Sequence, residues 1–270
     1  MSTRRSVDQI VGKALLFGYA LFILFPLFWM VNTAFKSMSE VLRFPPVWIA
    51  ENYTLEPFMS VATSPAVQAA LIDSLVINTA QTAVTMVFAT LAGYGFSRFR
   101  KITRARWVVF LILALSFLPA VTIVLPMFFI WDWLSLLDTR LGVIIAYLSF
   151  NVPFATWLMR DYFDRIPLSY ERAARVDGYS RLRTMRKVVV PLVMPGVFAV
   201  TVLAWIFGWT EFLFAFILGS ENVTTYTALY PNFQADREIL YNRQMSLALI
   251  ALAPPIVLIV GLRQRVVDLF

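Results

Sequence analysis

Six apolar stretches, each long enough to cross a membrane, dominate this sequence. The hydrocarbon core of a bilayer is about 30 Å thick, and a helix needs about 20 apolar residues to span it. The stretches cover residues 13–35, 71–96, 107–131, 141–159, 191–218 and 245–262. No segment between them alternates polar and apolar residues as a half-buried strand does. The sequence therefore predicts an all-α membrane protein with six transmembrane helices, in which residues 1–270 form a single transmembrane domain.

The composition agrees with a membrane protein and argues against other classes. Hydrophobic residues make up 60% of the 270 residues and charged residues 14%, whereas soluble domains average about 45–50% and about 25%. The chain contains neither Cys nor His, which removes disulfides, thiol nucleophiles and imidazole bases and leaves no metal site to predict. No paired carboxylates cluster within the spans, so we expect no catalytic residues and no enzyme.

The basic residues give the predicted orientation in the membrane. Most of the 23 Lys and Arg residues lie in loops on one side of the predicted spans. Cytoplasmic loops of membrane proteins carry such an excess. We therefore expect both termini and the loop at about residues 160–190 to be cytoplasmic. The same pattern accounts for the net charge of +7, so no nucleic-acid partner is predicted.

The loop at about 160–190 has the local chemistry of two short helices that meet at a glycine. Pro167 and Ser169 are start signals, and Asp177-Gly178 is a stop signal in which the glycine can take a positive φ. Ser180 can cap the second helix. One face of the first helix, small in its middle and charged at its ends, is formed by Glu171, Ala174, Arg175 and Gly178. A partner protein could approach such a face closely.

The run Glu171-x-Ala173-Ala174-x-x-Asp177-Gly178, with Pro191 beyond it, resembles the cytoplasmic EAA loop of ABC importer permeases. The resemblance is to the carbohydrate-type (type I) permeases, such as those of maltose transporters. It implies that the loop forms a coupling helix, which sits in a cleft of an ATPase subunit. The residues that it assigns to coupling are Glu171, Arg172, Ala173, Ala174, Asp177, Gly178 and Pro191. A simple topology signal is the alternative, but it would require neither the alanine pair nor Asp-Gly.

One residue of the loop departs from the family pattern. Arg172 stands where the family usually has a second Glu directly before the alanine pair. The usual ion pair between that Glu and the ATPase is therefore not expected at this position. Glu171 or Asp177 would substitute for it.

The resemblance also implies a set of partners. These are a second permease subunit in a heterodimer, two ATPase subunits, an extracytoplasmic solute-binding protein and the lipid bilayer. No Gly-rich phosphate loop with its Lys occurs in this chain. We therefore expect it to bind no cofactor, with ATP and magnesium held by the ATPase subunits. The expected location is the cell (inner) membrane of a bacterium or archaeon.

Polar residues inside two predicted spans are candidates for a substrate pathway, because polar groups are costly in a membrane. Asn78, Gln81 and Thr82 share one face of the second span. That face either lines a pathway or joins helices by hydrogen bonds.

The fifth span ends in an aromatic and acidic segment. Trp205 and Trp209 are one helical turn apart, and Glu211 follows them. Indole rings commonly cover the apolar face of a sugar, and Trp209-Thr210-Glu211-Phe212 resembles a Trp-Asn-Glu-Phe segment of the same family. Direct contact with substrate and structural packing both remain open for these residues.

Two longer segments, at residues 36–70 and 219–243, are expected on the outer side. The first is rich in proline and aromatic residues and resembles the family's outer loop that helps to dock a binding protein. A plain interfacial connector is the alternative.

Three other functions remain to be weighed against a carbohydrate importer. A secondary transporter driven by an ion gradient would need inverted repeats and intramembrane carboxylates, and Glu211 alone is thin support. A membrane-embedded enzyme would need a catalytic set. An ABC importer of a non-sugar polar solute would share every feature of the loop, so the solute itself is not given by the sequence.

Overall fold

The computed structural model describes residues 2–99, 118–235 and 238–267, together with Trp107, Leu111 and Ala114. These residues are mostly helical. The strands among them are β1 (Gln234–Ala235) and β2 (Glu238–Ile239), which pair antiparallel. The chain divides into two compact units, one of residues 1–68 and 230–253 and the other of residues 69–229 and 254–270.

The first unit is built on one long apolar helix, α1 (Ser2–Ala34). The other elements are α2 (Met38–Val41), α3 (Glu56–Ala62), the 3-10 turn η2 (Tyr230–Phe233) and α13 (Tyr241–Ala251). Helix α13 packs against α1 and α3. Ser246 Oγ donates to the carbonyl of Ala34 at 3.1 Å, and Asn242 Nδ2 donates to the carbonyl of Lys36 at 3.1 Å. Buried side-chain hydrogen bonds therefore fix α13 against the end of α1.

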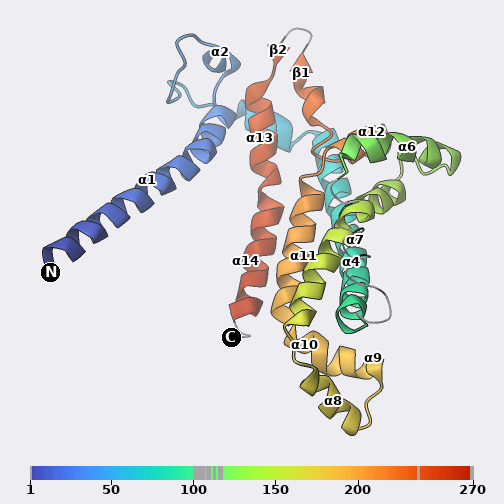
Figure 1. Ribbon diagram of the computed structural model, residues 1–270. Helices are drawn as coiled ribbons and strands as arrows, with labels where there is room; N and C mark the ends of the chain where they lie inside the picture. Colours follow the sequence, from blue (N-terminus) through green and yellow to red (C-terminus); the bar gives the residue numbers. More distant parts are fainter. Residues whose placement is uncertain are drawn as a thin grey trace. The chain divides into compact units, whose positions relative to one another are not determined.

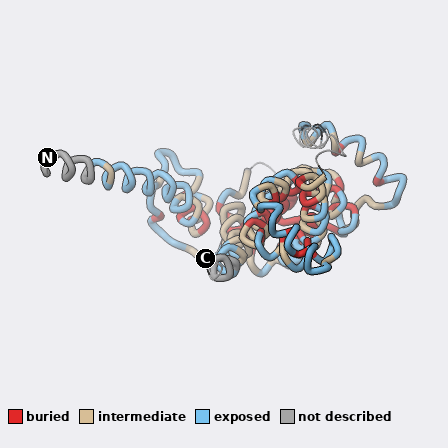
Figure 2. Tube along the Cα trace, turned by 60° about the horizontal axis from the view of Figure 1, so that its bottom comes forward, coloured by how far each residue is buried: buried red, intermediate tan, exposed pale blue. Residues whose placement is uncertain are grey.

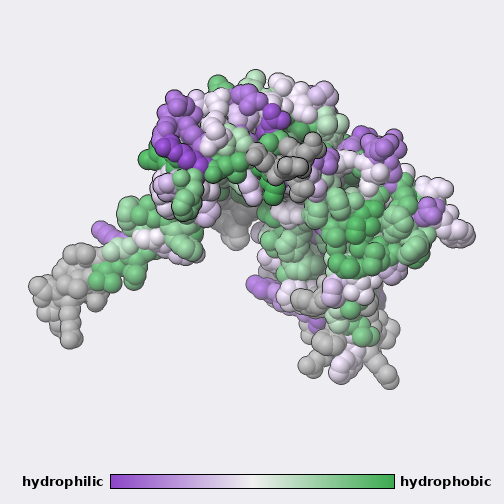
Figure 3. All heavy atoms as spheres, turned by 90° about the horizontal axis from the view of Figure 1, so that it is seen from above, coloured by the Kyte–Doolittle hydropathy of each residue, from purple (hydrophilic) through white to green (hydrophobic). Residues whose placement is uncertain are grey.

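Most of α1 is exposed along its apolar length. None of its most apolar window is buried inside the protein, and Leu16, Phe17 and Phe22 are 69%, 67% and 76% exposed. Figure 2 shows this exposure along the helix, and Figure 3 shows broad apolar areas on the surface, with hydrophilic side chains gathered in separate patches. Apolar surface of this extent marks a lipid or protein contact.

The second unit is a helical bundle around three long helices (Figure 1). These are α4 (Pro65–Arg98), α7 (Arg140–Asp164) and α11 (Met194–Trp209). The shorter elements are α6 (Ala120–Trp133), α8 (Leu168–Val176), α9 (Arg181–Thr184), the π-helix η1 (Met185–Val189), α10 (Val190–Leu192), α12 (Leu213–Leu218) and α14 (Ala253–Val267).

The core of this unit has two parts. One lies around Trp131, Tyr147 and Phe214, from α6, α7 and α12. The other lies around Met159, Phe163 and Val189, where α7 meets η1. The second part supports the charged loop, because α8 and α9 follow directly from α7 and lead into η1.

The predicted spans are found in part. Helices over residues 11–34, 65–98, 140–164 and 241–261 are long and apolar enough to cross a membrane. The fifth predicted span is instead a broken pair, Arg181–Leu192 and Met194–Trp209, bent by 79°. Pro191 and Pro195 lie on either side of the break, where each removes a backbone donor. Counting that pair as one span gives up to five among the described residues.

Part of the third predicted span, 107–131, lies outside the described part of the chain, at residues 108–110, 112–113 and 115–117. Its C-terminal portion is α6, which begins after Pro119 and continues through Pro126. The prediction of six spans with cytoplasmic termini therefore stays a prediction.

Candidate functional site

Helix α8 forms within the charged loop as the sequence predicts. Pro167 precedes it in an extended conformation, and Asp177 ends it. Gly178 has a φ of +82°, the left-handed conformation that glycine adopts without strain. The amide of Tyr179 donates to the carbonyl of Ala174 at 3.0 Å and closes the helix end. Ser180 then caps α9, as expected, by accepting from the amide of Arg183.

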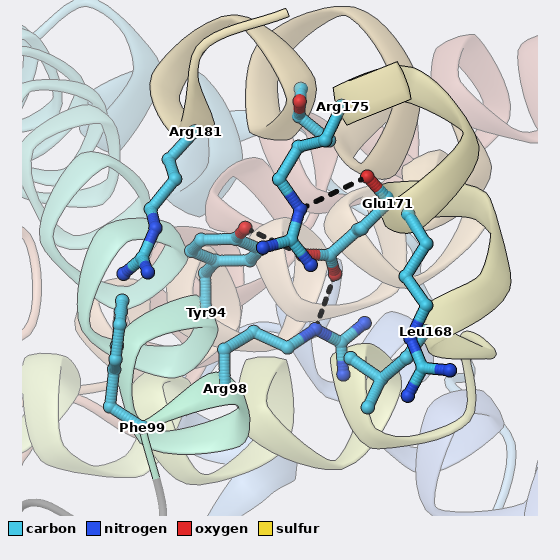
Figure 4. A pocket seen from close by; sticks show the side chains of 9 residues that line it. Tyr94, Arg98, Phe99, Leu168, Glu171, Arg175 and Arg181 are labelled. Carbon is cyan, nitrogen blue, oxygen red and sulfur yellow. Dashed lines mark hydrogen bonds and ion pairs between the residues drawn. The ribbon is translucent and has the colours of Figure 1, made fainter.

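Glu171 points into the bundle (Figure 4). Its Oε1 accepts from Arg98 Nε at 2.5 Å, and its Oε2 accepts from Tyr94 Oη at 2.9 Å. The side chains of Arg98 and Glu171 are each 9% exposed. A buried carboxylate is costly unless it is paired and hydrogen-bonded, and here both oxygens are satisfied by α4. The charge of Glu171 is thus compensated within this chain.

The last turns of α4 hold the loop at further points. Arg98 Nη2 donates to the carbonyl of Ile166 at 3.1 Å. Ser97 Oγ bonds Asp164 Oδ1 at 2.5 Å. The guanidinium of Arg181 lies 5.2 Å from the centre of the Phe99 ring. These contacts lie on both sides of α8 in sequence, so a displacement of α8 would act directly on the end of α4.

The other loop residues take different environments. Ala174 is 6% exposed and packs inside, whereas Arg172, Ala173 and Asp177 are exposed. Pro191 lies in α10, directly before the bend. The face with Glu171 and Ala174 therefore lies against this chain's own helices. The face available to another protein is the one with Arg172 and Ala173.

Tyr94 and Arg98 were not singled out from the sequence. They are spaced i and i+4 at the end of α4, so they share one helical face. A tyrosine and an arginine at that spacing, near a loop that contains a carboxylate, are a pattern from which the contact could be predicted. In the sequence, Arg98 is only one of several basic residues that flank the predicted spans.

The candidate pathway residues of α4 form a buried hydrogen-bonded network. Asn78 Nδ2 donates to the carbonyl of Trp205 at 2.9 Å. Gln81 Nε2 donates to Asn78 Oδ1 at 2.8 Å and to Thr82 Oγ1 at 2.8 Å. Asn151 Nδ2 of α7 donates to Gln81 Oε1 at 2.9 Å. All of these side chains are at most 4% exposed, apart from the 6% of Trp205. These bonds join α4 to α7 and α11, and a role of the three α4 residues in a substrate pathway stays a prediction.

The aromatic candidates are stacked on one another. The rings of Trp205 and Trp209 lie 4.8 Å apart at 12°, and Trp209 lies 4.7 Å from Tyr226. Both indoles are nearly buried, at 6% and 4% exposed. The carboxylate of Glu211 accepts from the amides of Leu213 and Phe214 at the start of α12. In this conformation the indole faces are covered, and Glu211 serves as a helix cap.

Within the described residues, no group of three or more acidic, His or Cys side chains could hold a metal ion.

The bundle of apolar helices, with a short helix on its charged loop, is the arrangement expected of a transporter's membrane-embedded subunit. Residues 85–269 match the family described as "Binding-protein-dependent transport system inner membrane component", and because this is more than half of the chain, the protein belongs to that family. The resemblance drawn from the Glu171 loop is thereby confirmed.

Several relatives are similar over most of their length. The sulfoquinovosyl glycerol transport system permease protein SmoH of Agrobacterium fabrum is 31% identical over 91% of this chain and 86% of its own. The trehalose transport system permease protein SugB of Mycobacterium tuberculosis is 30% identical over 81% and 77%.

A solved bacterial ABC transporter involved in the import of alginate has the same fold. It aligns with a TM-score of 0.77 at 21% identity, over 96% of both chains. The chain is therefore a multi-pass membrane permease with the type I ABC importer fold. As predicted, it is the permease subunit of an ABC importer, and the ATPase is a separate subunit.

Proposed function

We propose that this chain pairs with a second, related permease to form the translocation pathway for a carbohydrate. An extracytoplasmic binding protein delivers the solute, and two separate ATPase subunits bind ATP and magnesium and drive the transport. Six spans with both termini in the cytoplasm complete the proposed topology, in the inner membrane of a bacterium or archaeon.

The names of the relatives support the choice of carbohydrate. They include permeases for sulfoquinovosyl glycerol, trehalose, trehalose/maltose and diacetylchitobiose. All of these solutes are glycosides. Solved methionine transporter structures also share the fold, but with a lower TM-score of 0.59 and 13% identity. An importer of a non-sugar solute is therefore the second candidate.

The observation that carries the coupling mechanism is the contact between Glu171 and Arg98. ATPase closure would push on α8, and α8 would transmit the displacement to α4 through this buried pair. Because α4 is also hydrogen-bonded to α7 and α11, the push would reach the bundle as a whole. A rigid contact between packed helices transmits such a shift better than a mobile loop would.

The outer segment after α1 is folded in a way that suits docking of a binding protein. Lys36, only 2% exposed, donates from Nζ to the carbonyl of Val47. Asn32 Nδ2 donates to the carbonyl of Trp48 at 2.7 Å. These bonds hold a compact lobe with Phe44 and Trp48 exposed, at 92% and 63%. Exposed aromatic residues on a fixed backbone are typical of protein contacts.

The proposal is tested with the complete importer in proteoliposomes. The binding protein is offered trehalose, maltose, diacetylchitobiose, alginate oligosaccharide or methionine, and both ATP hydrolysis and solute uptake are followed. We expect one or more glycosides, but not methionine, to stimulate both. Uptake that persists without ATP and is abolished by an ionophore would contradict an ABC importer. Stimulation by methionine alone would contradict the carbohydrate assignment.

A further inference from the structure

A pocket of about 290 Å³ opens beside α8 at the end of α4 (Figure 4). This volume is just below the usual range of about 300–1,000 Å³ for pockets that hold small-molecule ligands. It suits one side chain or one small charged group better than an oligosaccharide. The residues that line it are Tyr94, Arg98, Phe99, Leu168, Glu171, Arg172, Arg175, Arg181 and Thr184.

The charges around this pocket are unbalanced. Glu171 is its single acidic lining residue, and it is already paired with Arg98 and Tyr94. Within the part of the chain that the structure describes, Arg172, Arg175 and Arg181 form no ion pair with a carboxylate. Arg175 makes only a long bond of 3.4 Å to the backbone carbonyl of Glu171. The pocket therefore carries a net positive charge.

A second feature of the pocket is an unsatisfied hydroxyl. Thr184 is 1% exposed, and its Oγ1 has no hydrogen-bond partner among the described residues. Buried polar groups are normally hydrogen-bonded, so an isolated one needs an explanation. A ligand oxygen in the pocket would supply the missing partner, and the same oxygen would suit the arginines.

We propose that this pocket receives a carboxylate from an acidic side chain of the ATPase subunit. The inference rests on the proposed coupling function of α8. Arginine and carboxylate form paired, charge-assisted hydrogen bonds, and Arg172 and Arg175 of α8 are both exposed. Figure 1 shows α8 and α9 at the tip of their unit, beyond the ends of α7 and α11. That position favours a protein partner over a lipid headgroup at the level of the helix ends.

In this contact the coupling helix is basic and the ATPase is acidic. These charges are the reverse of those expected when an acidic coupling helix docks on a basic ATPase. The acid of the motif, Glu171, is used inside the chain to hold α8 against α4. Arg172, which stands where the family has Glu, belongs instead to the basic pocket wall. A basic pocket that receives an acidic side chain thus explains both why Arg172 departs from the motif and why Glu171 is paired within the chain.

The first test is a zero-length carbodiimide cross-link in the assembled importer, which joins a lysine amine to a carboxylate in direct contact. Arg172→Lys and Arg175→Lys place amines at the pocket. We expect each to give a cross-link to the ATPase that is absent from the unsubstituted complex, mapped by mass spectrometry to an Asp or Glu. Arg165→Lys is the control, because Arg165, directly after the end of α7, pairs with Asp161 of that helix at 2.6 Å. It should give only an internal cross-link.

The second test reverses one charge. Arg172→Glu should weaken assembly with the ATPase about 10- to 100-fold, the usual effect of losing a charge-assisted hydrogen bond. The difference in affinity between the variant and the wild type should be smaller at high salt, because salt also screens the wild-type contact. Assembly that improves with this variant would overturn the proposed polarity.

The outcomes separate the two proposals. If the complex assembles and couples ATP to uptake but neither lysine cross-links, the pocket proposal is wrong and the coupling function stands. If the chain does not associate with an ATPase at all, both fail. If the Arg172 and Arg175 variants lose activity only in vesicles with anionic phosphatidylglycerol, and not in zwitterionic phosphatidylcholine, the occupant is an anionic lipid headgroup and the proposal is overturned.

Discussion

At the scale of single residues, Glu171 shows that a motif can identify an important side chain without showing which neighbour that side chain contacts. The sequence places it on one helical face with Ala174, and an ATPase was the expected neighbour of that face. The structure turns the face inward because Arg98 and Tyr94 neutralise and hydrogen-bond the carboxylate. Neither partner is near Glu171 in sequence, so only the folded chain reveals the contact.

Gly178 provides a test at one backbone position. Its φ of +82° is strained for any residue with a Cβ atom, although no atom lies within 4 Å of a Cβ added there. Gly178→Val should therefore act through the backbone alone, at a cost of about 1–3 kcal/mol, and disturb the end of α8. We expect reconstituted complexes to hydrolyse ATP with reduced uptake.

The control for this prediction is Gly178→Asn, because asparagine tolerates the left-handed conformation better than other residues do. It should retain most of the uptake. Equal uptake by the valine variant, in a complex that assembles normally, would show that the turn is not needed for coupling.

Asp138 organises a loop that the sequence did not single out. Its carboxylate accepts from the amides of Ser220, Asn222 and Val223 at 2.8, 2.9 and 2.9 Å. Burial, the largest single influence, would raise the pKa of this carboxyl, but the combined hydrogen bonds lower it below its usual value. The bonds join the turn before α7 to the segment after α12.

The lowered pKa predicts the pH range over which Asp138 stabilises the loop. The contribution is fully present above the unfolded pKa of about 3.9 and is lost as the pH falls through the lower folded value. Asp138→Asn should thus accelerate hydrogen exchange at the amides of Asn222 and Val223. The difference from wild type should be constant from about pH 5 to 8 and shrink below about pH 4. A difference that grows toward low pH would contradict the assignment.

At the scale of secondary-structure elements, α4 and α11 approach closely at Gly208. A Cβ atom at that position would collide with Asn78 Oδ1 and Gln81 Nε2. The polar network therefore depends on a glycine in the facing helix. The sequence predicts that Asn78 and Gln81 share a face. It does not predict that they donate to two backbone carbonyls of α11, those of Trp205 and Ala204.

Gly208→Ala tests this packing. The added methyl group should displace the amides and destabilise the bundle by about 1–3 kcal/mol, as overpacking does. Thermal unfolding of the purified protein in detergent measures the effect. Gly95→Ala in α4 is the matched control, since nothing lies within 4 Å of its added Cβ. Equal unfolding temperatures for the two variants would argue against a close approach.

The elements differ in how well the sequence predicts them. Helix α8 and the turn at Gly178 were predicted because local signals, from Pro167 to Asp177-Gly178, determine them. The break in the fifth span lies at Pro191 and Pro195, where the sequence allows a kink, but its angle of 79° could not be predicted. Proline patterns show where a helix can bend, but the packing of η1 and α11 on α7 sets whether it does.

At the scale of the whole molecule, the apolar pattern predicted a helical membrane protein, and the loop motif predicted its class. Apolar periodicity cannot say which helices touch, because lipid and protein interiors are equally apolar. The exposed length of α1 illustrates this point, since its sequence reads as an ordinary span. For the same reason, the long-range contacts of α4 with α7, α8 and α11 could not be predicted from the sequence.

The central claim is that the buried Arg98–Glu171 pair transmits ATPase movement from α8 to α4. Arg98→Gln leaves Glu171 buried without its charge partner, so the link should fail. Coupling free energies of about 1–3 kcal/mol correspond to about 5- to 150-fold effects. We therefore expect uptake to fall at least about fivefold while ATP hydrolysis continues without responding to the binding protein.

The matched control is Arg165→Gln, which removes an exposed pair with side chains 70% and 58% exposed. Exposed pairs contribute little, so uptake should be close to wild type. The decisive measurement is solute taken up per ATP hydrolysed, in proteoliposomes that hold equal amounts of assembled complex. A low ratio for Arg98→Gln with a normal ratio for Arg165→Gln is the predicted result. A normal ratio for both variants would contradict the account.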